Sequence, residues 1–143
     1  MFLGIDTDVL VNWMVTGSPH HESARQLFRS EIRKGTKLGL TPQVIFEFLH
    51  ICTDRRRFQH PLRMEEATSV VSDLWNGREI FQIVPQASVI YETVEWLNQL
   101  TLGRKRILDT ALAVTLKQAG VTRIATLSKQ DFQVFPFLEV VVP

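Results

Sequence analysis

Short apolar runs alternate along this chain with longer stretches of helical periodicity, and this alternation constrains the fold more than any other feature. The runs predict buried strands, because they are short and bounded by turn or cap residues. They cover residues 2–5, 37–40, 79–84, 123–126 and 138–142. Strands separated by helices pair in parallel and are covered on both faces. The sequence therefore predicts an α/β fold with a mostly parallel central sheet of about four to five strands.

Helical patterns occupy the segments between these strands. They cover residues 20–33, 42–52, 63–76, 86–100 and 107–118, and a further helix follows Asp6, with Thr7 or Asp8 as its cap. Pro42 suits a first helical turn, where its missing N–H is not needed. The segment it opens is apolar nearly all round, so we expect it to be buried. Segment 86–100 is predicted to be amphipathic, because one side carries Ile90, Val94, Leu97 and Leu100.

The bulk properties are those of one ordinary globular domain over residues 1–143, large enough for a single core. No apolar run approaches the roughly 20 residues needed to cross a bilayer, and Asp6 and Asp8 interrupt the region where a signal peptide would be apolar. The one cysteine, Cys52, cannot form an intrachain disulfide. We therefore expect a cytoplasmic protein without membrane contact. A net charge of +1 leaves polyanion binding to local patches.

Four carboxylates stand in apolar surroundings, where an unpaired charge is costly. Asp6 ends the run 2–5, Glu47 lies within 44–49, Asp109 interrupts 107–113, and Asp131 follows 124–127. Two of them follow predicted strands, while Asp109 lies in the first turn of its predicted helix and Glu47 in the second turn of its own. All four can therefore meet at the carboxyl end of the sheet, where α/β proteins bind ligands. We expect one acidic pocket that holds divalent cations.

Carboxylate oxygens select Mg²⁺ or Mn²⁺ over zinc, and no His or Cys stands beside these acids. A metal held by carboxylates activates water and stabilises the leaving oxygen in phosphodiester cleavage. Three of the acids have ordinary alternative explanations, because Asp6, Asp109 and Asp131 can each cap or begin a helix. Glu47 has none among its Val, Ile, Phe and Leu neighbours, so it most strongly favours a functional interpretation.

The four acidic motifs resemble those of the PIN (PilT N-terminus) domain family, most of all its VapC-type toxin branch. They read IDTDVL at 5–10, PQVIFEF at 42–48, RILDTALA at 106–113 and ATLSKQDF at 125–132. The resemblance implies a three-layer α/β/α sandwich and an endoribonuclease, dependent on Mg²⁺ or Mn²⁺, that leaves a 5′-phosphate and a 3′-hydroxyl. It assigns metal binding and catalysis to Asp6, Glu47, Asp109 and Asp131.

Four further residues match positions that brace this site in the family: Thr7, Asp8, Thr126 and Ser128. Asp8 and Ser128 both stand where Asn is the more usual residue. Asp8 adds negative charge near the metals, and the Ser128 hydroxyl can still make a supporting hydrogen bond. Neither departure removes a metal ligand, so the resemblance still implies an active enzyme.

Two basic clusters flank the acidic motifs. Arg55, Arg56 and Arg57 follow the Glu47 segment, and Arg104, Lys105 and Arg106 precede Asp109. A run of charges is often only a solvated surface. Here the placement also suits phosphate contacts around a site that would otherwise repel RNA. Both explanations stay open for each cluster. The resemblance adds an RNA substrate, a protein antitoxin lying across an apolar groove, and a homodimer.

Three other functions compete with a toxin ribonuclease. A stand-alone PIN nuclease would process RNA without an antitoxin. A phosphatase of the haloacid-dehalogenase type would use Asp6 and Asp8 at a strand end, but no closely spaced acidic pair follows Lys129, and Glu47 stays unexplained. A regulatory module would keep the fold without activity, and the intact set of four acids argues against it.

Overall fold

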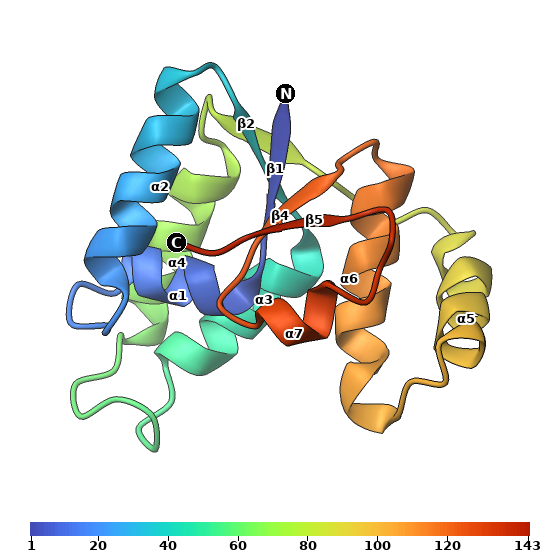
Figure 1. Ribbon diagram of the computed structural model, residues 1–143. Helices are drawn as coiled ribbons and strands as arrows, with labels where there is room; N and C mark the ends of the chain where they lie inside the picture. Colours follow the sequence, from blue (N-terminus) through green and yellow to red (C-terminus); the bar gives the residue numbers. More distant parts are fainter.

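The computed structural model describes residues 1–143 and has a five-stranded, all-parallel sheet with helices on both sides (Figure 1). The strands lie in the order β3-β2-β1-β4-β5. They are β1 (Phe2–Ile5), β2 (Lys37–Leu40), β3 (Ile80–Gln82), β4 (Arg123–Ala125) and β5 (Glu139–Val141). In the central pairs, Phe2 lies opposite Lys37 and Gly4 opposite Ile124. The predicted α/β fold is confirmed.

Helices α1, α2 and α4 lie on one side of the sheet and α5 and α6 on the other, while α3 and α7 lie at its lower end in Figure 1. The helices are α1 (Thr7–Met14), α2 (His21–Arg33), α3 (Pro42–Cys52), α4 (Met64–Trp75), α5 (Val89–Gln99), α6 (Ile107–Gln118) and α7 (Lys129–Phe132), with a 3₁₀ turn η1 (Arg104–Arg106) before α6. The bounds predicted for α3 and α6 are confirmed. The short elements α7 and η1 were not predicted, because neither is long enough to show a period.

Local capping explains why some helix ends were predictable. Thr41 accepts a hydrogen bond from Val44 N at 3.3 Å and Pro42 follows it, so α3 begins as its sequence indicates. Gly120 has φ +77° just after α6, a conformation that glycine adopts without strain. The cap of α1 is neither Thr7 nor Asp8. It is Asp6, as the alternative explanation of that acid predicted, and its side chain accepts from Thr7 N.

The sheet is held by a continuous apolar core, which keeps the strand ends in place. Leu3, Leu38, Phe48 and Leu112 are fully or almost fully buried within it. Gly4 lets α6 approach the sheet closely, since an added Cβ would lie 2.6 Å from Leu116 Cδ1. None of the helices combines the length and apolar composition that crossing a membrane requires.

Two helices are less covered than their apolar patterns indicate. Segment 42–52 was expected to be buried, yet Phe46 is 66% exposed and His50 is also exposed. On α5, Ile90 and Val94 of the predicted apolar side lie open to solvent, and Val89 and Thr93 are buried instead. The reason is position: α5 lies outside α6 rather than on the sheet (Figure 1), so only a narrow stripe of it is covered.

Candidate metal and active site

The candidate site lies where the strand order changes direction. From β1 the chain adds β2 and β3 on one side and then returns to place β4 on the other. Such a switch point opens a crevice at the carboxyl ends of the two central strands. Asp6 follows β1 and Thr126 follows β4, and Asp6 N donates to Ala125 O at 3.0 Å. The Thr126 hydroxyl donates to Asp6 Oδ2 at 2.7 Å.

Asp6 is the most buried of the four predicted acids, with 9% exposure. Its Oδ1 accepts from Thr7 N at 2.8 Å, so it also caps α1. Burial, followed by the charge of Asp8, raises the pKa of Asp6 to about 7, although the hydrogen bonds from Thr126 and Thr7 oppose this shift. The capping explanation and membership of the acidic cluster are therefore both true of this residue.

Glu47 points into the same crevice. Its Oε2 accepts from the Thr7 hydroxyl at 3.0 Å and its Oε1 from Gln43 Nε2 at 3.0 Å. Gln43 also donates to Leu108 O at 3.1 Å, which joins α3 to the first turn of α6. The neighbours on α3 diverge, since Phe48 is buried in the core while Phe46 faces solvent. An apolar sequence context thus surrounds a side chain that lies in a polar pocket.

Asp109 and Asp131 complete the cluster. Asp109 lies in the first turn of α6, and Asp131 lies in α7. Burial, then the charge of Asp131, raises the pKa of Asp109 to about 6, with further contributions from Glu47 and Asp8 and an opposing one from Arg106. Asp131, Glu47 and Asp8 all lie near enough to Asp109 to raise its pKa, so acids from the four motifs lie around one crevice.

The loop after β4 is bound to α1 through Asp8. Its Oδ1 accepts from Leu127 N at 3.2 Å and its Oδ2 from the Ser128 hydroxyl at 2.9 Å. Ser128 N in turn donates to the Thr126 hydroxyl at 2.9 Å. Asp8 and Ser128 are the two positions that depart from the family pattern, and here they bond to each other. The structure brings together all eight residues predicted for the site and its surroundings.

The donor chemistry fits Mg²⁺ or Mn²⁺, because every candidate ligand is a carboxylate oxygen. Burial, followed by neighbouring carboxylates, raises the pKa of Asp6 and of Asp109, and a bound cation would favour the ionised form of both acids. As the side chains lie, no three His, Cys, Asp or Glu are placed so that they could hold one ion. Asp6, Glu47, Asp109 and Asp131 are the residues that could do so after moving closer together.

Arg106 is placed differently from the other predicted RNA-contacting residues. Its Nε lies 3.6 Å from Asp109 Oδ2 and its Nη1 lies 3.7 Å from Asp131 Oδ1, and its Nη2 donates to Asp131 O. The guanidinium of Arg106 therefore faces into the acidic cluster, while the side chains of Arg104 and Lys105 are exposed to solvent.

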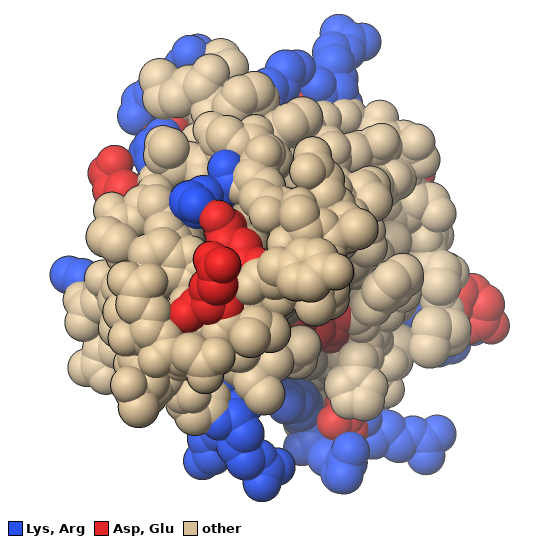
Figure 2. Space-filling view, turned by 90° about the vertical axis from the view of Figure 1, so that its right-hand side faces the viewer, with Lys and Arg blue, Asp and Glu red and all other residues tan.

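Arg55, Arg56 and Arg57 are exposed in the loop between α3 and α4. Asp54 lies 3.3 Å from Arg56 Nε and 3.9 Å from Arg57 Nε. This loop and the segment before α6 both lie at the lower end of the molecule in Figure 1. Lys and Arg side chains also gather at the lower edge of the view in Figure 2. RNA contact by either cluster remains a prediction.

Gln43 and the inward direction of Arg106 were not predicted. Both residues lie at helical spacing from an acid, Gln43 four residues before Glu47 and Arg106 three before Asp109, and that spacing could have identified them. Glu31, the most buried carboxylate with 3% exposure, was not predicted either. Glu31 lies at the other end of the sheet, where Arg123 contacts it at 3.0 and 3.3 Å.

Comparisons with known proteins agree with this geometry. The family model described as "PIN domain" matches residues 4–137. The chain is 27% identical over 140 residues to Ribonuclease VapC24 of Mycobacterium tuberculosis, covering 96% of this chain and 94% of that protein. It is 29% identical over 126 residues to Ribonuclease VapC33 of the same organism, covering 85% and 72%.

Solved structures share the fold at lower sequence identity. VapBC-1 from nontypeable Haemophilus influenzae superposes with a TM-score of 0.70 at 14% identity and covers 99% of this chain and 98% of that one. A toxin–antitoxin complex from Klebsiella pneumoniae gives a TM-score of 0.66 at 14% identity, covering 97% and 95%. At these identities the likeness concerns the fold alone.

Proposed function

The chain belongs to the PIN domain family, and on that basis we propose that it is a divalent-metal-dependent endoribonuclease. The observation that carries the proposal is the cluster of four carboxylates at the switch point of the sheet, with the pKa of Asp6 raised to about 7 and that of Asp109 to about 6. Its relatives at 27–29% identity are named ribonucleases.

The residues of the chain divide the work in a way that their contacts support. Asp6, Glu47, Asp109 and Asp131 would hold Mg²⁺ or Mn²⁺, which when bound supplies a polarised water and stabilises the leaving oxygen of the phosphodiester. The hydroxyls of Thr126 and Thr7 orient Asp6 and Glu47. Asp8 and Ser128 instead hold the loop after β4 against α1. Exposed Arg55, Arg56, Arg57, Arg104 and Lys105 would contact RNA phosphates.

Induced expression in bacteria tests the activity. The wild-type chain should arrest growth and produce RNA fragments with 5′-phosphate ends, and Asp6→Asn should do neither. Asn is as good a helix cap as Asp, so this variant should keep its fold. Equal arrest by both proteins would refute the assignment of the site.

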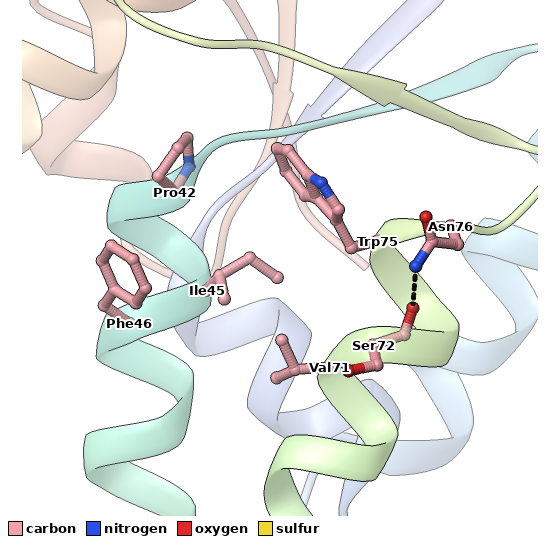
Figure 3. A pocket seen from close by; sticks show the side chains of 7 residues that line it. All are labelled: Pro42, Ile45, Phe46, Val71, Ser72, Trp75 and Asn76. Carbon is pink, nitrogen blue, oxygen red and sulfur yellow. Dashed lines mark hydrogen bonds between the residues drawn. The ribbon is translucent and has the colours of Figure 1, made fainter.

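We further propose that an antitoxin binds the apolar groove between α3 and α4. Figure 3 shows Ile45 of α3 pointing toward Val71 and Trp75 of α4, with Pro42 at the upper end of the groove. The cavity measures about 300 Å³ and also has Phe46 in its lining. Phe46 is adjacent in sequence to Glu47, so a peptide in this groove would end close to the acidic cluster. Several structural neighbours are toxin–antitoxin complexes.

Co-expression tests this partner. The product of a small gene directly upstream should relieve growth arrest, and Phe46→Ser should abolish the relief while the purified variant still cleaves RNA. Met64→Ser, at the opposite end of α4 and also exposed, is the matched control. Arrest that no upstream product relieves would favour the alternative, a stand-alone RNA-processing nuclease.

We also propose that α5 forms part of a homodimer interface. Ile90, Tyr91 and Val94 are exposed on this helix, and the side of the molecule that carries it is largely uncharged apart from a group of acidic side chains and a basic one near its middle (Figure 2). Exposed apolar patches mark association surfaces. Light scattering should give the mass of two chains for the wild type and of one chain for Tyr91→Asp.

A further inference from the structure

Arg106 combines three features that no other basic side chain of the site shares. It lies within ion-pair distance of both Asp109 and Asp131, at 3.6 and 3.7 Å. It is 21% exposed, whereas Arg104 and Lys105 of the same turn are open to solvent. Its Nε is buried and has no hydrogen-bond partner. A buried donor without a partner is costly in a native structure, so the position of this guanidinium calls for an explanation.

We propose that Arg106 is an internal counter-cation of the acidic cluster, which lies between Asp109 and Asp131 in the metal-free protein and is displaced when a divalent cation binds them. This inference rests on the proposed function, since it concerns the same metal site. It makes Arg106 a positioning residue: its charge offsets the repulsion between the two carboxylates, and it sets how strongly the site binds metal.

The contacts of Arg106 with the two carboxylates are weak enough for its side chain to move out of the acidic cluster. Neither of its ion pairs is within hydrogen-bond distance, and the one hydrogen bond it donates goes to the backbone oxygen of Asp131 rather than to a carboxylate. Arg123 offers the contrast, since it donates two hydrogen bonds to the Glu31 carboxylate at 3.0 and 3.3 Å. A bidentate arginine–carboxylate pair of that kind holds both side chains in one arrangement, whereas the ion pairs of Arg106 place no such constraint on its side chain.

A guanidinium and a divalent cation also exclude each other here. Arg106 approaches Asp109 Oδ2 and Asp131 Oδ1, so a divalent cation held by those oxygens would compete with its guanidinium for them. Two cations that close in a partly buried site repel strongly. The long side chain of Arg106 can turn outward while the backbone of η1 stays in place, because it has several rotatable bonds.

Metal affinity tests the inference directly. Arg106→Gln removes the competing cation, so calorimetry should show Mn²⁺ binding about three- to tenfold tighter than in the wild type. Lys105→Gln makes the same charge change one residue away without touching the acids, and it should alter the affinity less than twofold. Equal or weaker binding by Arg106→Gln would overturn the proposal, as would an equal gain in both variants.

A measurement on the wild-type protein avoids the risk that a variant misfolds. The Nε–H signal of Arg106 in a ¹⁵N spectrum, identified by its loss in Arg106→Gln, should shift and exchange faster with water when saturating Mg²⁺ is added. A signal that stays unchanged at saturation would overturn the proposal. A wild type that binds no metal and cleaves no RNA would refute the proposed function itself, whereas metal binding and cleavage without these changes would refute only the role of Arg106.

Discussion

Two buried carboxylates at opposite ends of the sheet have similar exposure and opposite electrostatics. Glu31 is 3% exposed and Asp6 is 9% exposed. Arg123, Thr36 and Lys34 all donate to Glu31, and the hydrogen bonds led by that of Arg123 lower its pKa to about 2. Asp6 receives hydrogen bonds from Thr7 and Thr126 but faces other acids, and its pKa rises to about 7.

The comparison shows that burial alone does not identify a functional acid. Both residues have lost water, but only Glu31 has gained a cation that makes its charge favourable. No cation contacts Asp6 to stabilise its ionised form, as is expected of a metal ligand before the metal binds. Of these two acids, it is Asp6, which no cation contacts, and not the more buried Glu31, that lies in the candidate site.

The largest expected effect comes from removing a charge at the acidic end. Asp109→Asn removes a predicted metal ligand. Loss of a residue that only hydrogen-bonds a ligand already costs roughly 10- to 100-fold in metal affinity or activity, so this variant should lower metal-dependent RNA cleavage by at least that factor. Glu31→Gln should leave the cleavage rate of the folded fraction unchanged. Rates in Mn²⁺ and in EDTA measure both, and equal losses in the two variants would break the comparison.

Breaking the ion pair between Arg123 and Glu31, at the other end of the sheet, should lower stability and not activity. Arg123→Ala leaves the buried Glu31 without its main partner and should lower the free energy of unfolding by about 3 kcal/mol. Arg25→Ala removes an arginine from an exposed pair with Glu22 and should leave the melting temperature unchanged. Urea unfolding followed by circular dichroism would measure the free energy of unfolding of each variant. An Arg123→Ala protein as stable as the wild type would contradict the role given to the Glu31–Arg123 pair.

The two ends should also respond oppositely to pH in the absence of metal. The folded-state pKa of Glu31 lies below its usual value, so its contribution to stability is present above about pH 4.5 and is lost as pH falls toward 2. The folded-state pKa values of Asp6 and Asp109 lie above their usual values, so stability should fall as pH rises from about 4 to 7.

Melting curves in EDTA at several pH values would measure this fall, and saturating Mg²⁺ should remove most of it, since the cation favours the ionised acids. Asp6→Asn should also flatten the profile between pH 5 and 7, because it removes the group with the larger shift. A wild-type protein whose stability rises steadily from pH 4 to 7 would contradict the repulsion inferred among the acids.

The smallest expected effect concerns the basic surface beside the acidic end. Arg56→Ala should weaken RNA binding and reduce the slope of log affinity against log salt by about 1, without changing metal affinity. Arg33→Ala, an exposed arginine at the end of α2, is the control and should leave the slope unchanged. An equal slope for wild type and Arg56→Ala would remove this cluster from the RNA surface.

Features that depend on short stretches of chain were predictable. The run 37–40 and the helices 42–52 and 107–118 have the bounds that their apolar patterns and caps indicate, because hydrogen bonding and side-chain periodicity act over a few residues. The four acids were also identifiable, since each interrupts an apolar segment. Their meeting followed from one topological rule about where parallel strands end.

Only the tertiary structure decided which charges meet. Nothing local to Glu31 indicates its pairing with Arg123, which is 92 residues away, and nothing local to Arg106 indicates its contacts with Asp131, which is 25 residues away. The exposure of Phe46 and of the α5 face likewise depends on which helix lies outside another. The sequence by itself determined the elements and the candidate ligands, whereas partners distant in the chain determined the charge environment of each, because electrostatic free energy depends on distance in space.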